Sequence, residues 1–98
     1  GPAFFYKIAQ TMVKDGVSQG LSQDLAEQLV YQTMRGASKM LLKTGKDSQT
    51  LIDDVTSPNG TTAAGLAAFD EQSLHLGLTA MVQAAVKRSK ELSQLNEE

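Results

Sequence analysis

Apolar residues recur at intervals of three and four along nearly the whole chain, and this spacing predicts α-helices rather than strands. The first predicted helix runs from Ala3 to about Gln19, where Gly16 and Gly20 weaken its end. A second is expected to start after Ser22 as N-cap and to continue to about Thr44. Its first turn carries Asp24, and Gly45 follows as a stop. One stripe of this helix has Leu25, Leu29, Thr33 and Met40, and a second stripe alongside it has Ala26, Val30, Ala37 and Leu41.

The rest of the chain predicts three further helices. A short one spans about residues 48–55, capped by Asp47 or Ser48 and ending ahead of Pro58, since the residue before a proline avoids helical geometry. The others cover residues 61–69 and 74 to about 95, with the sole histidine, His75, at the start of the last. No segment has the alternation of a strand, so the sequence predicts an all-α domain of five helices.

Small residues within the helices point to a partner. The helix predicted over 22–44 is apolar on more than one stripe, yet it contains Gly36, which costs about 1 kcal/mol relative to alanine in a helix interior. The last helix carries Ala80, Ala84 and Ala85, which permit close approach of another helix. Because 98 residues can hardly cover all these faces, we expect an intertwined helical homodimer. The alternative is a compact monomeric bundle.

Composition narrows the function classes. The chain is one domain in length and has a net charge of −2, from 9 basic and 11 acidic residues, which favours neither nucleic acid nor an anionic membrane. It has no cysteine, and no metal-ligand set can be built around its one histidine. No apolar run reaches the roughly 20 residues of a membrane span, and the start of the chain lacks a signal-peptide pattern. A cytoplasmic location is therefore the expectation.

One polar stretch, DDVTSPNGTTAAG at residues 53–65, stands directly before an alanine-rich helix. Pro58, Asn59 and Gly60 predict a turn, in which Asn and Gly can take positive φ, and Thr61 or Thr62 would then cap the helix. The stretch can be only a loop and a cap. It can also be an anion site, because N–H groups at a helix N-terminus bind carboxylates and phosphates, and the neighbouring hydroxyls add polar contacts.

The stretch DDVTSPNGTTAAGL resembles the signature of the pyrroline-5-carboxylate reductase family. The segments GPAFFY, GVSQGLSQDLAEQLVYQTMRGASKMLLKTGK and AVKRSKEL resemble that family's C-terminal domain in the same order, so the resemblance covers residues 1–98. It implies an all-helical dimerisation and substrate-binding domain of an oxidoreductase. That enzyme reduces L-1-pyrroline-5-carboxylate to L-proline in proline biosynthesis, with NADPH or NADH as hydride donor. Whether the dimers assemble further is left open.

The resemblance also implies site residues. Ser57, Gly60 and Thr61 match positions that hold the substrate carboxylate, Gly60 and Thr61 chiefly through backbone N–H groups. Thr62 matches the threonine whose hydroxyl meets the ring nitrogen; since a threonine hydroxyl is a poor acid, we expect it to orient the imine or a water. In the alternative reading, the chain is a helical dimerisation or adaptor module whose loop only caps a helix.

The family's nicotinamide cofactor is bound by an N-terminal Rossmann domain, marked by a Gly-x-Gly-x-x-Gly turn between a strand and a helix. The sequence contains no such turn, so the resemblance implies that these 98 residues alone neither bind the cofactor nor turn over. Two departures put the local loop shape in doubt. Asn59 stands where the family commonly has glycine, but asparagine tolerates left-handed geometry, so we expect the turn to survive. Asp47-Ser48 replaces a frequent His-Pro.

Overall fold

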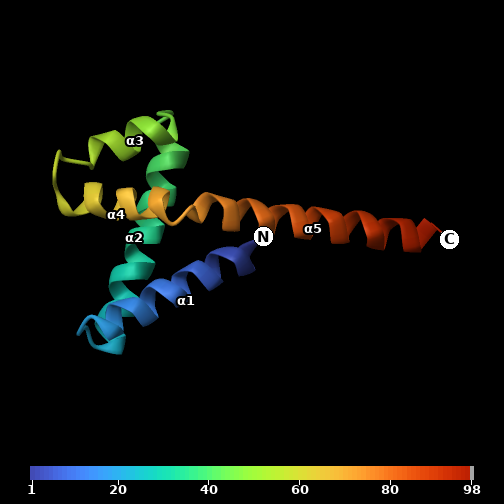
Figure 1. Ribbon diagram of the computed structural model, residues 1–98, viewed down its shortest axis with the longest axis horizontal. Helices are drawn as coiled ribbons and strands as arrows, with labels where there is room; N and C mark the ends of the chain where they lie inside the picture. The colour runs from blue at the N-terminus through green and yellow to red at the C-terminus, as the bar shows by residue number, and fades with distance from the viewer. Residues whose placement is uncertain (98) are drawn as a thin grey trace. The chain divides into compact units, whose positions relative to one another are not determined.

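The computed structural model describes the backbone of residues 1–97 and the side chains of residues 1–95. Within residues 1–97 the chain forms five helices and no strand, as the apolar spacing predicts (Figure 1). The helices are α1 Pro2–Ser18, α2 Gln23–Lys43, α3 Ser48–Asp54, α4 Thr61–Glu71 and α5 Leu74–Glu97. The predicted all-α fold class is confirmed, and no predicted boundary differs from the observed one by more than two residues.

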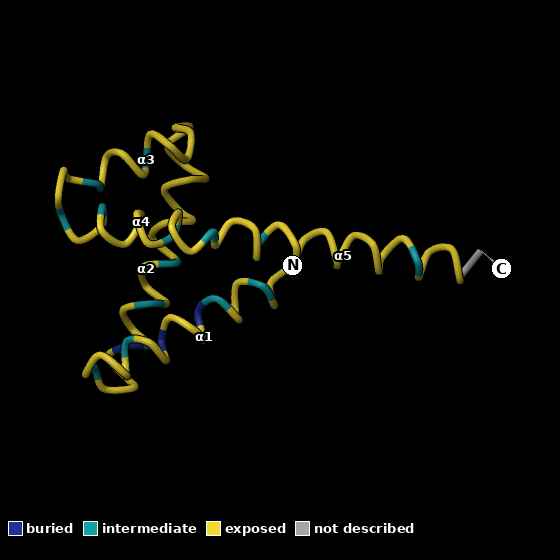
Figure 2. The backbone as a smooth tube through the Cα atoms, viewed as in Figure 1, coloured by how far each residue is buried: buried dark blue, intermediate teal, exposed yellow. Residues whose placement is uncertain are grey.

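The chain divides into two compact units, Gly1–Ile52 and Asp53–Glu98. The first unit is built on the pair α1 and α2, and the second on the pair α4 and α5. Among the described side chains only Ala9, Val13 and Ala26 are buried, and all three lie where α1 packs on α2 (Figure 2). A Cβ added to Gly16 would lie 3.4 Å from Cβ of Ala26, so small residues allow the two helices to approach closely.

The connection from α1 to α2 is a Schellman motif. Gly20 has φ of +110°, its N–H donates to the Val17 carbonyl at 3.0 Å, and the Leu21 N–H donates to the Gly16 carbonyl at 3.1 Å. Glycine suits this position because side chains are strained at that φ. On the far side of the turn the Ser22 hydroxyl accepts from the Leu25 N–H at 3.2 Å, which confirms the predicted N-cap of α2.

The ends of α2 and α3 also follow the sequence signals. Gly45, with φ of +71°, comes directly after the last cap residue of α2 and confirms the predicted stop. Of the two candidate caps for α3, the observed one is Asp47: its Oδ1 accepts from the Thr50 N–H at 2.8 Å. α3 ends at Asp54, one residue earlier than predicted, well ahead of Pro58.

The predicted N-cap of α4 is wrong. Neither Thr61 nor Thr62 occupies that position; the N-cap is Gly60, which makes no side-chain cap hydrogen bond. The Gly60 N–H closes a turn onto the Ser57 carbonyl at 3.1 Å, so the chain leaves the turn one residue earlier and Thr61 already has helical geometry. Positive φ occurs at Asn59, at +62°, but not at Gly60, whose φ is −83°.

Helices α4 and α5 are separated by Gln72 and Ser73 alone. The Gln72 N–H donates to the Ala68 carbonyl at 2.9 Å, and Ser73, with φ of +53°, turns the chain out of helical geometry. The Ser73 carbonyl then accepts from the Leu76 N–H in the first turn of α5. His75 lies in this first turn, at the start of α5, as the sequence predicts.

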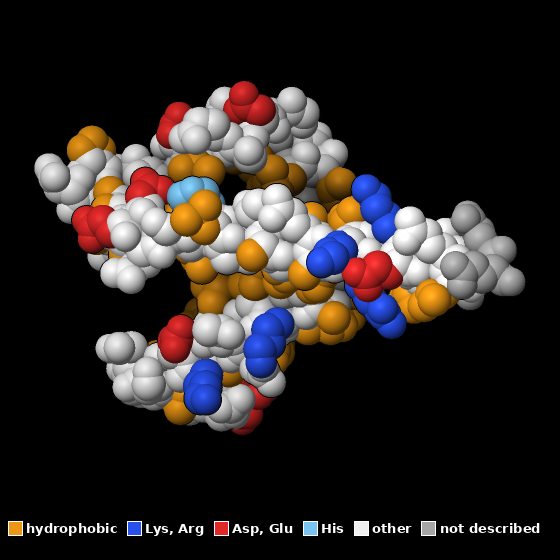
Figure 3. Space-filling model, turned by 45° about the vertical axis from the view of Figure 1, so that its right-hand side comes forward, with side chains coloured by type: hydrophobic (Ala, Val, Ile, Leu, Met, Phe, Trp, Pro, Cys, Tyr) orange, Lys and Arg blue, Asp and Glu red, His pale blue; other side chains and the backbone are white. Residues whose placement is uncertain are grey.

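Large apolar side chains are exposed in both units, and Figure 3 shows those on one face. Examples are Leu29 at 50%, Leu41 at 51% and Val82 at 51% exposure, and no large side chain among residues 1–95 is fully buried. Exposed apolar side chains of this size on both units indicate that each helix pair is incomplete without further packing.

The cap of α3 makes a first testable prediction. Hydrogen bonds from the Thr50 side chain and backbone lower the pKa of the exposed Asp47 carboxyl below its ordinary value. A lowered folded-state pKa means that the cap stabilises α3 above the unfolded-state pKa and is lost as pH falls through the folded-state value. We expect the Thr50 amide shift to titrate at a pH below the ordinary pKa of an aspartate. In an Asp47→Asn variant, which keeps the acceptor without the charge, this titration should vanish.

Candidate functional site

The polar loop that the sequence singles out folds as a tight turn followed at once by α4. Ser57 to Gly60 have the features of a type II turn: Pro58 in second place, Asn59 at positive φ in third place, and a closing hydrogen bond of 3.1 Å from the Gly60 N–H to the Ser57 carbonyl. Asparagine tolerates this left-handed geometry, so the expectation that the turn survives without the family's glycine is confirmed.

The N-terminus of α4 presents backbone donors directly after the turn. The first hydrogen bond within α4 runs from the Ala64 N–H to the Gly60 carbonyl at 3.1 Å. The N–H groups of Thr61, Thr62 and Ala63 therefore precede the first closed turn and have no acceptor within the helix. Since no side chain caps this end, the donors and the positive end of the helix dipole are open to a small anion.

The turn and the first turn of α4 also carry three residues with hydroxyl groups, all of them exposed: Ser57, Thr61 and Thr62. Ser57 is brought back against the cap residue by the turn, because a Cβ built on Gly60 would lie 2.5 Å from the Ser57 Oγ. The structure thus places all four predicted site residues within one turn and the first turn of α4. The Gly60 N–H, predicted to contact a carboxylate, is already engaged with the Ser57 carbonyl.

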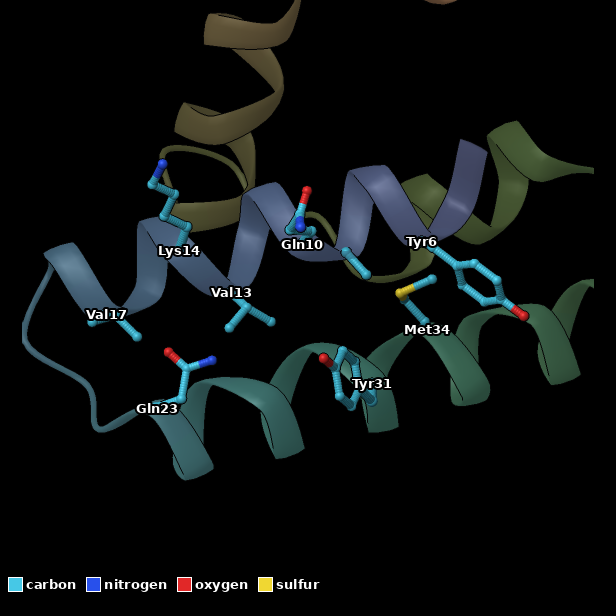
Figure 4. Close-up of a pocket in the computed structure, with 9 residues that line it drawn as sticks. Tyr6, Gln10, Val13, Lys14, Val17, Gln23, Tyr31 and Met34 are labelled. Atoms are coloured by element: carbon cyan, nitrogen blue, oxygen red, sulfur yellow. The ribbon is translucent and has the colours of Figure 1, made fainter. Parts of the chain in front are cut away.

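A groove of about 730 Å³ lies elsewhere, in the first unit between α1 and α2 (Figure 4). Val13 and Val17 of α1 point toward α2, and the rings of Tyr6 and Tyr31 lie near Met34. Its lining is mostly apolar and contains no acid–base pair, so it offers no pair of groups for general acid–base catalysis. Sequence reasoning missed both Tyr31 and Met34. A signal for Met34 was present, because it lies four residues after Val30 and three before Ala37 on one apolar stripe of α2.

Neither a metal site nor a membrane-spanning helix is found in the described part of the chain. No group of three or more His, Cys, Asp or Glu side chains there could hold a metal ion. None of the helices it forms is long and apolar enough to cross a bilayer. His75 is exposed at the start of α5.

Known proteins of one family match nearly the whole chain. The family model described as pyrroline-5-carboxylate reductase dimerisation matches residues 1–92. The chain is 43% identical over 94 residues to pyrroline-5-carboxylate reductase 1 of Bacillus subtilis, covering 96% of the chain and 32% of that protein. It is 46% identical over 94 residues to the pyrroline-5-carboxylate reductase of Arabidopsis thaliana, covering 96% and 34%. The chain thus spans about one third of the length of these relatives.

Two solved structures of proteins with the same or a closely similar name also resemble this chain. The chain superimposes on the Plasmodium falciparum pyrroline carboxylate reductase with NADP bound at a TM-score of 0.88 and 37% identity, covering 92% of this chain and 34% of that one. It matches the Coxiella burnetii pyrroline-5-carboxylate reductase at a TM-score of 0.89 and 35% identity, covering 94% and 34%.

Proposed function

Because the chain belongs to the pyrroline-5-carboxylate reductase dimerisation family, we propose that it is the substrate-binding and dimerisation domain of an enzyme that reduces L-1-pyrroline-5-carboxylate to L-proline. Residues 1–98 would follow an N-terminal Rossmann domain in the full-length protein. The observation that carries the proposal is the loop of residues 57–62, which sets hydroxyls and open helix donors side by side in a member of this family.

The substrate has two polar groups, a carboxylate and an imine nitrogen, and the loop offers a contact for each. The Thr61 N–H and the Ser57 hydroxyl are donors suited to the carboxylate, supported by the positive end of the α4 dipole. Gly60 stands between Ser57 and Thr61 in the sequence. The Thr62 hydroxyl would then meet the ring nitrogen and orient the imine or a water, a role that needs position rather than acidity.

The nicotinamide cofactor does not fit the residues of this chain. Dinucleotide sites of the Rossmann kind need a glycine-rich turn between a strand and a helix, and residues 1–97 contain neither that motif nor a strand. We therefore assign NADPH or NADH, which supplies the hydride, to the Rossmann domain of the full-length enzyme. This chain contributes the orientation of the substrate, and alone it is expected to be inactive.

The partner is a second copy of the same chain. Exposed apolar residues lie on both helix pairs, and an open groove runs beside Tyr31 and Met34, so an intertwined homodimer would bury surface that one chain leaves in water. A higher assembly of dimers is compatible with the same surfaces. We place the enzyme in the cytoplasm, where its small-molecule substrate and reduced nicotinamide cofactor would be available.

A titration of L-proline into the 98-residue chain tests the carboxylate site without the cofactor domain. We expect saturable amide shifts confined to residues 57–63, because the donors of this loop are already in place. Acetate, which has the carboxylate without the ring, should shift the Thr61 amide more weakly. Absence of any saturable shift in the loop, together with undiminished activity of loop variants in the full-length protein, would instead favour the adaptor alternative, in which the loop only starts a helix.

A further inference from the structure

We draw no further inference here: the strongest candidate, the apolar groove between α1 and α2 beside Tyr31 and Met34, belongs to the surface already assigned to the second copy of the chain, and nothing in the described residues shows which segment covers it.

Discussion

Replacing Thr62 by alanine in the full-length enzyme is expected to lower kcat for proline formation by about 100-fold or more, the range in which positioned proton-transfer and orienting groups act. Thr62 is exposed in the first turn of α4, the turn whose open N–H groups we assign to the carboxylate. In the role that we propose for Thr62, removal of its hydroxyl would leave the ring nitrogen without the contact that aligns the imine carbon with the hydride donor. Steady-state kinetics at saturating substrate measures the effect.

The structure makes this experiment easier to interpret than the sequence alone suggests. A capping threonine would have coupled the loss of the hydroxyl to a loss of stability, but the cap is Gly60 and no side chain serves it. Alanine is also the better helix former, by up to about 0.7 kcal/mol. The melting temperature of Thr62→Ala should therefore stay level or rise. Thr62→Ser, which keeps a hydroxyl, is the control and should retain most of the activity.

Full activity in a well-folded Thr62→Ala enzyme would show that Thr62 has no role in the reaction. The loop would then serve only to begin α4. Loss of activity in both Thr62→Ala and Thr62→Ser would point to the threonine methyl group, and so to packing, rather than to the hydroxyl.

Placing leucine at Gly36 is expected to weaken the homodimer at least 100-fold. Within the described chain a Cβ at Gly36 meets nothing within 4 Å, and leucine is the better helix former, so a monomer would tolerate or even gain from the change. A partner helix packed closely on this glycine cannot accept the added volume, because overpacking forces the two helices apart. Sedimentation equilibrium over a range of concentrations gives the dissociation constant.

Gln28→Leu is the matched control, because it adds the same side chain to the same helix. Gln28 is exposed, and its spacing of four from Asp24 and seven from Arg35 places it on the polar face of α2. Its dissociation constant should change less than about threefold. A chain that sediments as a monomer at all concentrations, or a Gly36→Leu variant that dimerises as well as the original, would contradict the homodimer. The apolar faces would then have to be covered by packing of the two units within one chain.

The sequence by itself determined the five helices, because each is set by local information. Apolar spacing, the Ser22 cap, the glycine stops at 20 and 45, and the proline at 58 act within a few residues of where the chain turns. The loop that carries the candidate site was also visible in the sequence, because its residues are consecutive and its signature resembles that of one family.

Tertiary structure decided what depends on three-dimensional placement. Residue type alone predicted the wrong cap for α4, because the cap depends on where the turn closes, and the structure shows it closed by the hydrogen bond from the Gly60 N–H to the Ser57 carbonyl. The same turn also sets the position of the Ser57 hydroxyl, whose oxygen lies 2.5 Å from the point where a Cβ on residue 60 would be. The groove beside Tyr31 and Met34 exists only because α1 folds back on α2. Helical periodicity shows which residues share a face, but only packing shows which faces one chain leaves uncovered.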